Sequence, residues 1–187
     1  RKSIKKERRS VIEQGMTFRI TEGKDISDDQ WRTFTRFYEG TYMMRGMQGY
    51  LNESFFRMLS STMPDQLFMN SAIQNKETIA AALFFKSEKQ LFGRYWGSAQ
   101  DYQFLHFETC YYQGQDYCIE HGLESFDSGA QGEHKIQRGF EPIITHSNHW
   151  IANPGFADAI SNFLKEEESH IQQYIRQART LLPYKQG

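Results

Sequence analysis

Three strand-like runs that follow one another almost without interruption constrain the fold of this chain most strongly. They cover residues 66–74, 78–86 and 90–98, and only the short polar turns at residues 75–76 and 87–89 separate them. Connections this short join neighbouring antiparallel strands. The middle of the chain therefore predicts a three-stranded antiparallel sheet.

The segment after the third run predicts a helix that crosses over to another strand. Residues 102–121 carry apolar side chains at helical spacing, and Gly122 follows as a C-terminal cap. Residues 123–126 are typical of a short strand. A strand reached by such a crossover pairs in parallel within the same sheet. The expected fold is therefore α/β (α+β), with a mixed, mostly antiparallel sheet and helices on both faces.

Flanking segments add further elements on both sides of this sheet. Before it, we expect a basic helix over 2–14 stopped by Gly15, a strand over 16–21, and helices over 27–42 and 53–62. Ser27 and Gln30 form a capping-box pattern at the start of the helix expected over 27–42. After the sheet, we expect a short helical piece over 133–138, a strand over 141–147 and a last helix that begins at Asn153.

The composition is that of a globular domain with an unusual share of aromatic residues. The chain has 187 residues and a net charge of −1, so the whole molecule offers no electrostatic argument for nucleic-acid binding. Residues 1–9 are locally basic, which suits a solvated helix or contact with phosphate or a membrane surface. The 15 Phe, 10 Tyr and 3 Trp residues indicate an aromatic core or a groove for a flat or apolar group.

Cysteine usage and hydropathy predict a cytoplasmic location. No run approaches the roughly 18–20 apolar residues that span a bilayer, and no signal peptide is recognisable. Cys110 and Cys118 lie on the expected middle helix, about 12 Å apart along its axis, too far for a disulfide. Free thiols agree with a reducing compartment. Because the chain begins at Arg1 within a helical pattern, we expect it to be part of a longer protein.

Both the order of the elements and several sequence motifs resemble those of a known group of enzymes. The order resembles the GNAT acyltransferase fold. The opening RKSIKKERRSVIEQGMTFRI resembles the start of the second domain of Fem-type aminoacyl transferases, and FDSGAQGEHKIQRGF resembles their glycine turn with its closing Gly-Phe. The stretch LFGRYWGSAQDYQFLHFETCYYQGQDYCIEHGL, together with FDSGAQGEHKIQRGFEP, is similar to the FemAB-like branch of peptidoglycan biosynthesis or recognition proteins.

This resemblance covers nearly the whole chain and implies direct, metal-free transfer of an acyl group to an amine. It implies that residues 1–187 form a single GNAT-like domain, the C-terminal half of a longer two-domain protein. The acceptor would be a small molecule or a peptidoglycan precursor. The donor would be acetyl-CoA or another acyl-CoA, with aminoacyl-tRNA, and hence tRNA as a partner, as the alternative.

One departure from the GNAT pattern concerns the expected pyrophosphate site. GNAT enzymes that use acetyl-CoA typically carry a Gln/Arg-x-x-Gly-x-Gly/Ala loop before the middle helix. Backbone amides of this loop hold the pyrophosphate. The corresponding stretch here is GSAQDYQF, which lacks the glycine pair and contains Asp101. A carboxylate at this place would repel a pyrophosphate.

Glu108 and His106 are the candidate catalytic bases, because direct acyl transfer requires removal of a proton from the amine. Glu108 flanks the apolar side of the expected helix beside Tyr112, a candidate substrate-binding residue; an ordinary boundary glutamate is the alternative. His106 suits proton transfer by its ordinary pKa, or is a structural histidine. On a regular helix the two point roughly 160–200° apart, which excludes a dyad.

Arg94 and Trp96 are candidate substrate-binding residues on the strand before the crossover. Simple alternation places Arg94 on one face with Phe92 and Trp96. An arginine among aromatic side chains needs an anionic partner. We expect Glu108, or a carboxylate or phosphate of the substrate, to be that partner.

Three residues of the glycine-turn motif FDSGAQGEHKIQRGF are the remaining candidates. Asp127 either forms a turn or pairs with Lys135. Lys135 and Arg138 match the basic part of the motif, which suits an anionic ligand or a solvated turn. His146 and His149 would face opposite sides of the expected strand, so no metal site is expected.

Three functions follow from these observations. The first is an N-acyltransferase whose cleft lies between the Arg94 strand and the Glu108 helix. The second is a catalytically silent recognition domain that holds a peptide or glycopeptide in the same cleft. The third is a structural half that supports a missing N-terminal domain, for which a filled cleft with Glu108 bound to Arg94 would be evidence.

Overall fold

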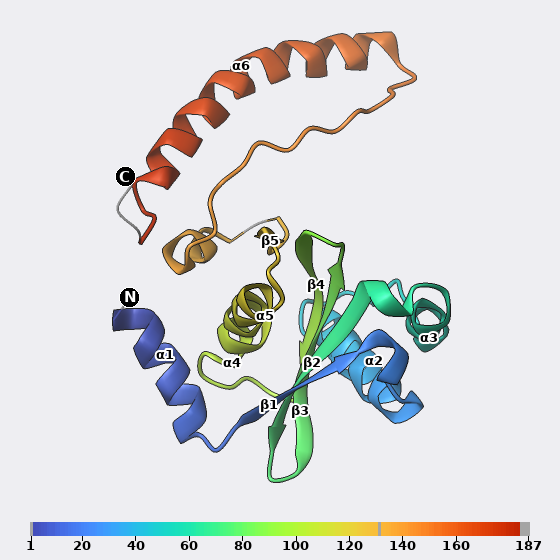
Figure 1. The fold of residues 1–187 in the computed structure, drawn as a ribbon. Coiled ribbons are helices and arrows are strands. Elements are labelled where there is room, and N and C mark those ends of the chain that lie inside the picture. Colours follow the sequence, from blue (N-terminus) through green and yellow to red (C-terminus); the bar gives the residue numbers. More distant parts are fainter. Residues whose placement is uncertain (1, 131, 184–187) are drawn as a thin grey trace. The chain divides into compact units, whose positions relative to one another are not determined.

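The short turns of the sequence produce the central sheet of this protein. The computed structural model describes residues 2–130 and 132–183, and the chain divides after Ala130 into two units. The first unit holds the sheet and its covering helices, and the second holds a short 3-10 helix and the long last helix (Figure 1). Each unit is described by itself.

The helices and strands of the first unit follow the predicted order. They are α1 (Lys2–Glu13), β1 (Thr17–Glu22), η1 (Gly23–Asp25), α2 (Asp28–Met43), α3 (Glu53–Thr62), η2 (Pro64–Gln66), β2 (Leu67–Gln74), β3 (Glu77–Lys86), β4 (Gln90–Ser98), α4 (Leu105–Phe107), η3 (Glu108–Tyr112), α5 (Gln113–His121) and β5 (Ser125–Asp127). The predicted strands and helices up to residue 127 are thus confirmed, with shifts of a few residues at their ends.

The sheet has the order β1-β2-β3-β4-β5. Its first four strands pair antiparallel, and β5 pairs in parallel with β4. Asn75 and Lys76, at the β2–β3 turn, both have positive φ, 51° and 69°. Two such residues give the hairpin turn whose twist matches that of the strands. The mixed, mostly antiparallel sheet predicted from the sequence is confirmed.

Helices cover both faces of the sheet (Figure 1). On one face, α2 and α3 pack through a cluster that includes Trp31, Phe34 and Phe56. On the other face, the run α4–η3–α5 packs on Phe68 and Phe84. Burying one such side chain contributes about 1.5–3 kcal/mol. Much of the aromatic content therefore forms the two cores.

The start of α2 is fixed by the predicted capping box. The Ser27 hydroxyl accepts from the Gln30 backbone N–H at 3.3 Å. The Ser27 backbone N–H in turn donates to the Gln30 side chain at 3.0 Å. Two backbone donors that the first helical turn leaves unpaired are satisfied in this way.

The crossover helix begins later than predicted and is not regular. Phe104 has a φ of 63°, in the left-handed region, and the helix proper starts at Leu105. Its second segment, η3, is a π-helical turn, which shifts the directions of the side chains that follow. Gly122 closes the run with a φ of 68° and donates its N–H to the Cys118 carbonyl. The predicted glycine cap is thus confirmed.

The second unit contains η4 (Glu133–Arg138) and α6 (Pro154–Arg179). Asn153 caps α6 as predicted, since its side chain accepts from the Phe156 N–H at 3.0 Å. The strand predicted over 141–147 is wrong: residues 140–150 have no regular structure and are almost all exposed. Alternating side chains make a strand only where an edge pairs with it. No helix in the described part of the chain is long and apolar enough to cross a membrane.

Candidate functional site

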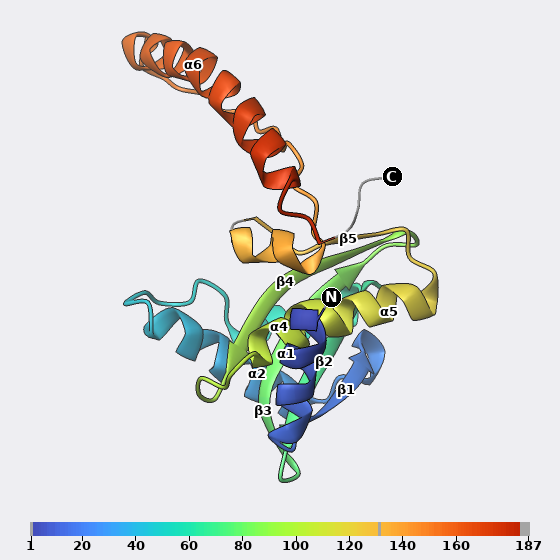
Figure 2. The same cartoon turned by 90° about the vertical axis from the view of Figure 1, so that its left-hand side faces the viewer.

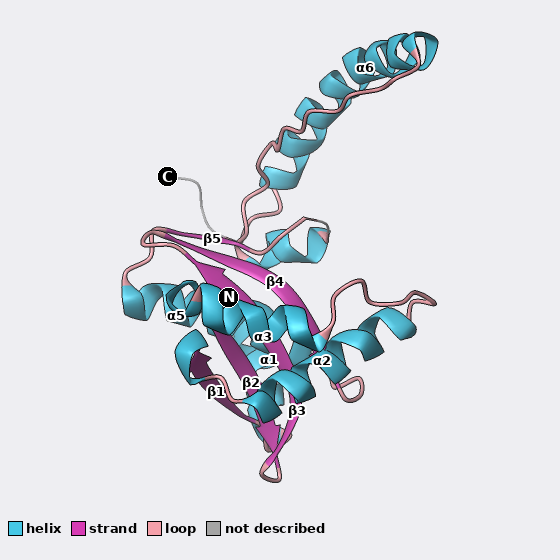
Figure 3. Ribbon diagram, turned by 90° about the vertical axis from the view of Figure 1, so that its right-hand side faces the viewer, coloured by secondary structure: helices cyan, strands magenta, loops and turns pink. Residues whose placement is uncertain are grey.

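Strands β4 and β5 separate soon after they begin to pair. Their register contains three pairs, which end at Phe92 and Asp127. Residues 93–98 continue β4 beyond this pairing, as the sheet in Figure 3 shows. Where a neighbouring strand stops pairing, the edge of the remaining strand can bind an extended chain through backbone hydrogen bonds. The opening between β4 and β5 is therefore the first candidate for a ligand-binding edge.

A β-bulge at Arg94 lies directly beyond the last β4–β5 pair. On β3, Phe84 is opposite Gly93 and Leu83 is opposite Tyr95, so Arg94 has no opposite residue. The extra residue interrupts the alternation of side chains, which is how a bulge redirects a strand. Bulges of this kind are common beside binding sites.

This bulge corrects the predicted placement of Arg94 with Phe92 and Trp96. Phe92 is opposite Phe85, which packs with the α2–α3 side of the sheet. Trp96 packs with the clusters on the other side. Arg94 itself is exposed, and its guanidinium carbon lies 4.9 Å from the centre of the Tyr95 ring.

The structure brings two predicted site residues, Trp96 and His106, together. Their rings meet edge to face with centroids 5.2 Å apart. The Tyr111 ring also meets the His106 ring edge to face, with centroids 5.2 Å apart. The start of the crossover helix thus lies over the part of β4 that β5 has left. His106 is half-buried there.

Glu108 is buried, with 3% of its surface exposed, and its ion-pair partner is on α1. Its Oε1 accepts from Arg8 Nη2 at 3.0 Å and from Gln113 Nε2 at 2.8 Å. The predicted Glu108–Arg94 pair is therefore wrong. Arg94 is exposed to solvent at the bulge. Glu108 lies in the π-helical turn beside α1, where the Arg8 guanidinium is its ion-pair partner in place of Arg94.

Arg8 connects two acids of the crossover helix to α1. Besides Glu108, it pairs with Asp116, and its hydrogen bond to Asp116, followed by the charge of Glu108, raises the pKa of the guanidinium. Sequence reasoning missed this residue, because six basic side chains in residues 1–9 look like one solvated face. The lone acid among them, Glu7, was the available signal.

Tyr112 faces α1 as well. It is 1% exposed, its hydroxyl donates to the Glu7 carboxylate, and the Arg8 guanidinium lies 5.7 Å from its ring centre. These contacts join η3 to α1, and Figures 1 and 2 show α1 beside the run that begins with α4. Its predicted contact with substrate stays a prediction.

The predicted turn at Asp127 is confirmed. Its Oδ1 accepts from the Gly129 backbone N–H at 2.7 Å, and Gly129 has a φ of 80°. Lys135 and Arg138 belong to the second unit. There, Arg138 is 7% exposed and its Nη1 donates to the His134 carbonyl at 2.8 Å, which stabilises η4. Their role in binding stays a prediction.

A cluster of tyrosines, missed by the sequence analysis, lies on the α2 side of β4. The Tyr95 ring meets Tyr38 with centroids 5.7 Å apart, and Tyr38 meets Tyr42 at 4.8 Å. Tyr50, from the α2–α3 loop, meets Tyr42 at 5.9 Å and is 65% exposed. Burial raises the pKa of Tyr38 and of Tyr95. The spacing of Tyr38 and Tyr42 by one helical turn was the available signal.

The start of the crossover helix does not fit a pyrophosphate. Asp101 is exposed there, and Phe104 has a bulky side chain at a positive φ, a backbone conformation that favours glycine. The Leu105 N–H already donates to the Tyr102 carbonyl at 3.3 Å. A helix start binds phosphate through free N–H groups and without nearby carboxylates. Residues 93–98 of β4, by contrast, have no paired strand on the β5 side among the described residues.

The described residues contain no group of three or more His, Cys, Asp or Glu side chains that could hold a metal ion. Neither Cys110 nor Cys118 forms a disulfide within the described part of the chain. Burial raises the pKa of Cys118 to about 11, which makes it a poor nucleophile.

The mixed sheet with its helical crossover, bulged fourth strand and parallel fifth strand agrees with the GNAT-like fold expected from the sequence. The FemAB-like family, described as peptidoglycan biosynthesis/recognition, matches residues 1–186. The chain therefore belongs to the FemAB-like family. No curated protein sequence matches the chain.

Solved structures agree with this fold. A possible acetyltransferase from Clostridium difficile 630 has a TM-score of 0.55 at 9% identity, covering 74% of this chain and 99% of its own. An aminoglycoside acetyltransferase from an uncultured soil metagenomic sample, in complex with sisomicin, has a TM-score of 0.52 at 12% identity, covering 76% and 98%. At these identities the likeness establishes the shared fold alone.

Proposed function

We propose that this chain is an N-acyltransferase domain that holds its acyl donor along residues 93–98 of β4 and transfers the acyl group to an amine. The observation that carries this proposal is the early separation of β4 from β5, with the bulge at Arg94 directly beyond the last pair. An extended donor would complete the abandoned strand edge by backbone hydrogen bonds.

The chemistry requires three things of this edge. The amine nitrogen attacks the acyl carbonyl carbon, the bond to the donor's leaving group breaks, and the amine loses a proton. A bulge leaves backbone N–H groups outside the regular ladder, and such groups suit the developing oxyanion. His106, beside Trp96 over the same edge, is the candidate base. Glu108 is better suited to positioning the helix through Oε1, which accepts from Arg8 and Gln113, although its buried Oε2 has no hydrogen-bond partner among the described residues.

The acceptor side would lie at the tyrosine cluster. Tyr42, Tyr50 and Tyr95 offer ring faces and hydroxyls, which suit sugars and peptide groups. Arg94, exposed beside Tyr95, could pair with a carboxylate. These features, together with the family's description, support a peptidoglycan precursor as the acceptor.

Two donors remain in competition. An acyl-CoA fits the fold class, but Asp101 and Phe104 oppose its pyrophosphate. Aminoacyl-tRNA is supported by the exposed basic face of α1, formed by Lys2, Lys5, Lys6 and Arg9 at helical spacing. We also propose that the domain acts in the cytoplasm and forms the C-terminal half of a longer two-domain protein.

A thermal-shift titration tests the donor. Acetyl-CoA, CoA and aminoacyl-tRNA are each added to the chain and to its variants. A ligand at about 100 times its Kd stabilises the native state by about 2.7 kcal/mol, which raises the Tm by about 5–10 °C for a chain of this size. His106→Gln and Arg94→Gln should reduce the shift or the transfer rate. Arg19→Gln, which changes an exposed arginine on β1, is the matched control.

Each outcome has a distinct meaning. A shift with acetyl-CoA that Arg94→Gln weakens and Arg19→Gln does not supports a CoA donor at this edge. A shift with aminoacyl-tRNA alone supports the Fem-like donor. Binding of a peptidoglycan fragment without any transfer in the presence of either donor would refute the enzyme and support the recognition domain.

A further inference from the structure

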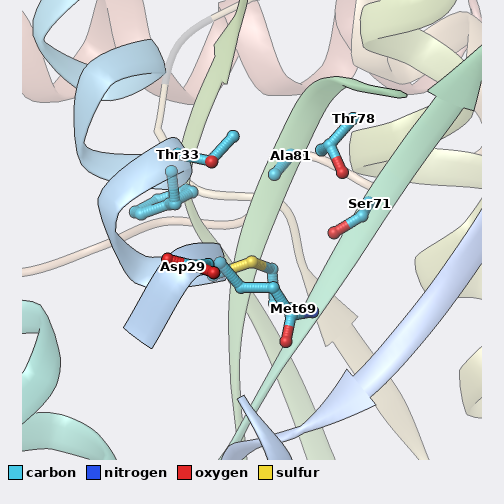
Figure 4. Close-up of a pocket in the computed structure, with 8 residues that line it drawn as sticks. Asp29, Thr33, Met69, Ser71, Thr78 and Ala81 are labelled. Carbon is cyan, nitrogen blue, oxygen red and sulfur yellow. The ribbon is translucent and has the colours of Figure 1, made fainter. Parts of the chain in front are cut away.

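A pocket of about 130 Å³ lies on the α2 side of the sheet, between the first turns of α2 and strands β2 and β3 (Figure 4). It is distinct from the β4 edge and does not depend on the proposed function. We propose that it binds a small uncharged molecule that carries hydroxyl or amide groups.

Ser71 on β2 provides the central observation. The residue is 3% exposed and lines the pocket. Its Oγ is buried and has no hydrogen-bond partner among the described residues. In Figure 4 this oxygen points from β2 toward the space below α2. Buried hydroxyls nearly always have a partner, because burial without one is unfavourable. A ligand in the pocket would supply it.

A second hydroxyl reaches the pocket because of a β-bulge. Ala80 is opposite Ala72 and Thr78 is opposite Ile73, so Ile79 has no opposite residue. Ile79 packs on the far face of the sheet, with Ala72 and Ala80. Thr78 therefore turns to the α2 side, where it lines the pocket together with Ser71. Bulges redirect side chains in this way beside binding sites.

The α2 wall is rigid and electrically neutral. Gln30 is held by the capping box and donates its side-chain amide to Thr21 Oγ1 at 3.0 Å. Thr33 adds a third hydroxyl to the lining. Asp29 lies at the mouth with an 85% exposed side chain, but it is paired with Arg32 at 2.6 Å. Since the two charges offset one another, the pocket favours an uncharged ligand.

The size and the lining of the pocket narrow the class of ligand further. A cavity of about 150 Å³ suffices for benzene, so this pocket admits a molecule of about six non-hydrogen atoms. Phe34 and Met69 supply apolar contact. The three hydroxyls of Thr33, Ser71 and Thr78 both donate and accept hydrogen bonds. Small polyols and amides combine these properties.

Methyl NMR of the full chain labelled at methionine tests the proposal. Met69 lines the pocket and is 1% exposed, so its methyl signal reports on the ligand. Met43 and Met44 are each 72% exposed and serve as internal references. Glycerol, acetamide, acetate and benzene are titrated separately. We expect glycerol or acetamide to shift Met69 saturably, and the references to stay unchanged.

Two variants separate binding from packing. Ser71→Ala removes the hydroxyl and should weaken binding of the polar probe about three- to tenfold, the loss of one hydrogen bond. Thr109→Val is the matched control, because it also removes a buried Oγ that lacks a partner among the described residues, but in η3, which does not line the pocket. It should leave the affinity unchanged.

The proposal fails in any of three ways. A Met69 signal that no probe moves means that the pocket holds water only. A response to benzene or acetate without one to glycerol or acetamide refutes the polar, uncharged class. Equal affinities of Ser71→Ala and the unchanged chain refute the role of the Ser71 hydroxyl.

Discussion

Replacing Arg8 with methionine tests whether the contact between α1 and the crossover helix depends on a buried charge pair. The substitution keeps an unbranched side chain but leaves the Glu108 carboxylate, whose side chain is 4% exposed, with Gln113 as a remaining partner. Breaking a fully buried pair costs about 3–5 kcal/mol. The Arg8 side chain is 34% exposed, so water can partly replace it. We therefore expect a loss of about 2–3 kcal/mol, at or below the lower end of that range.

Urea unfolding followed by tryptophan fluorescence measures this loss. Asp116→Asn is the matched control, since it removes the other acid that pairs with Arg8. Its side chain is 50% exposed, and exposed pairs contribute about 0–1 kcal/mol. The double variant Arg8→Met with Glu108→Gln should recover part of the stability, because no buried charge then lacks its partner. If Arg8→Met costs no more than Asp116→Asn, or if the double variant recovers nothing, the reasoning is wrong.

Three further predictions follow from single contacts. Gly97→Ala should lower the free energy of unfolding by more than about 2 kcal/mol in the same assay, because strained overpacking commonly costs 1–3 kcal/mol and the new Cβ would lie 2.3 Å from the Phe37 carbonyl carbon. A loss below 0.5 kcal/mol, roughly the scatter of neutral surface changes, would contradict this close approach. Ser27→Ala should cost about 1 kcal/mol by removing the α2 cap, whereas Ser27→Asn should cost little; equal losses would exclude capping as the cause. At pH 8, Cys118 should react with iodoacetamide far more slowly than a free peptide thiol, because its pKa is about 11. Mass spectrometry after timed quenching measures the rate, and a rate equal to that of the peptide would contradict the burial of this thiol.

Local signals in the sequence sufficed for most of the fold. The Ser27 capping box, the glycine cap at Gly122 and the two-residue turn at Asn75 each depend on contacts within a few residues. Such contacts exist wherever the chain folds, so the pattern predicts them directly. The crossover from β4 to β5 followed because handedness and pairing rules leave few alternatives.

The parts of the site that the sequence missed depend on contacts between distant segments. Alternation cannot reveal that Arg94 has no opposite residue, because a bulge is set by the partner strand. The partner of Glu108 lies 100 residues earlier in the chain, in a helix whose charge pattern resembled a solvated face. The segment over 141–147 alternates like a strand, yet no described strand pairs with it.

The identity of the acyl donor depends on which parts of a binding site need particular residues and which need only the backbone. A strand edge binds an extended amide chain through backbone groups, which almost any sequence provides. A pyrophosphate site needs glycine and free helix N–H groups, and here Asp101 and Phe104 occupy that place. Under the proposed function, the chain thus offers the backbone edge for an acyl donor and lacks the glycine and free helix N–H groups that a pyrophosphate needs. We therefore expect acetyl-pantetheine and acetyl-CoA to bind with affinities within about threefold, whereas a pyrophosphate held by charge-assisted hydrogen bonds would add about 1.5–3 kcal/mol per bond, tenfold or more. Isothermal titration with both thioesters decides: a tenfold preference for acetyl-CoA would mean that the helix start binds phosphate despite Asp101.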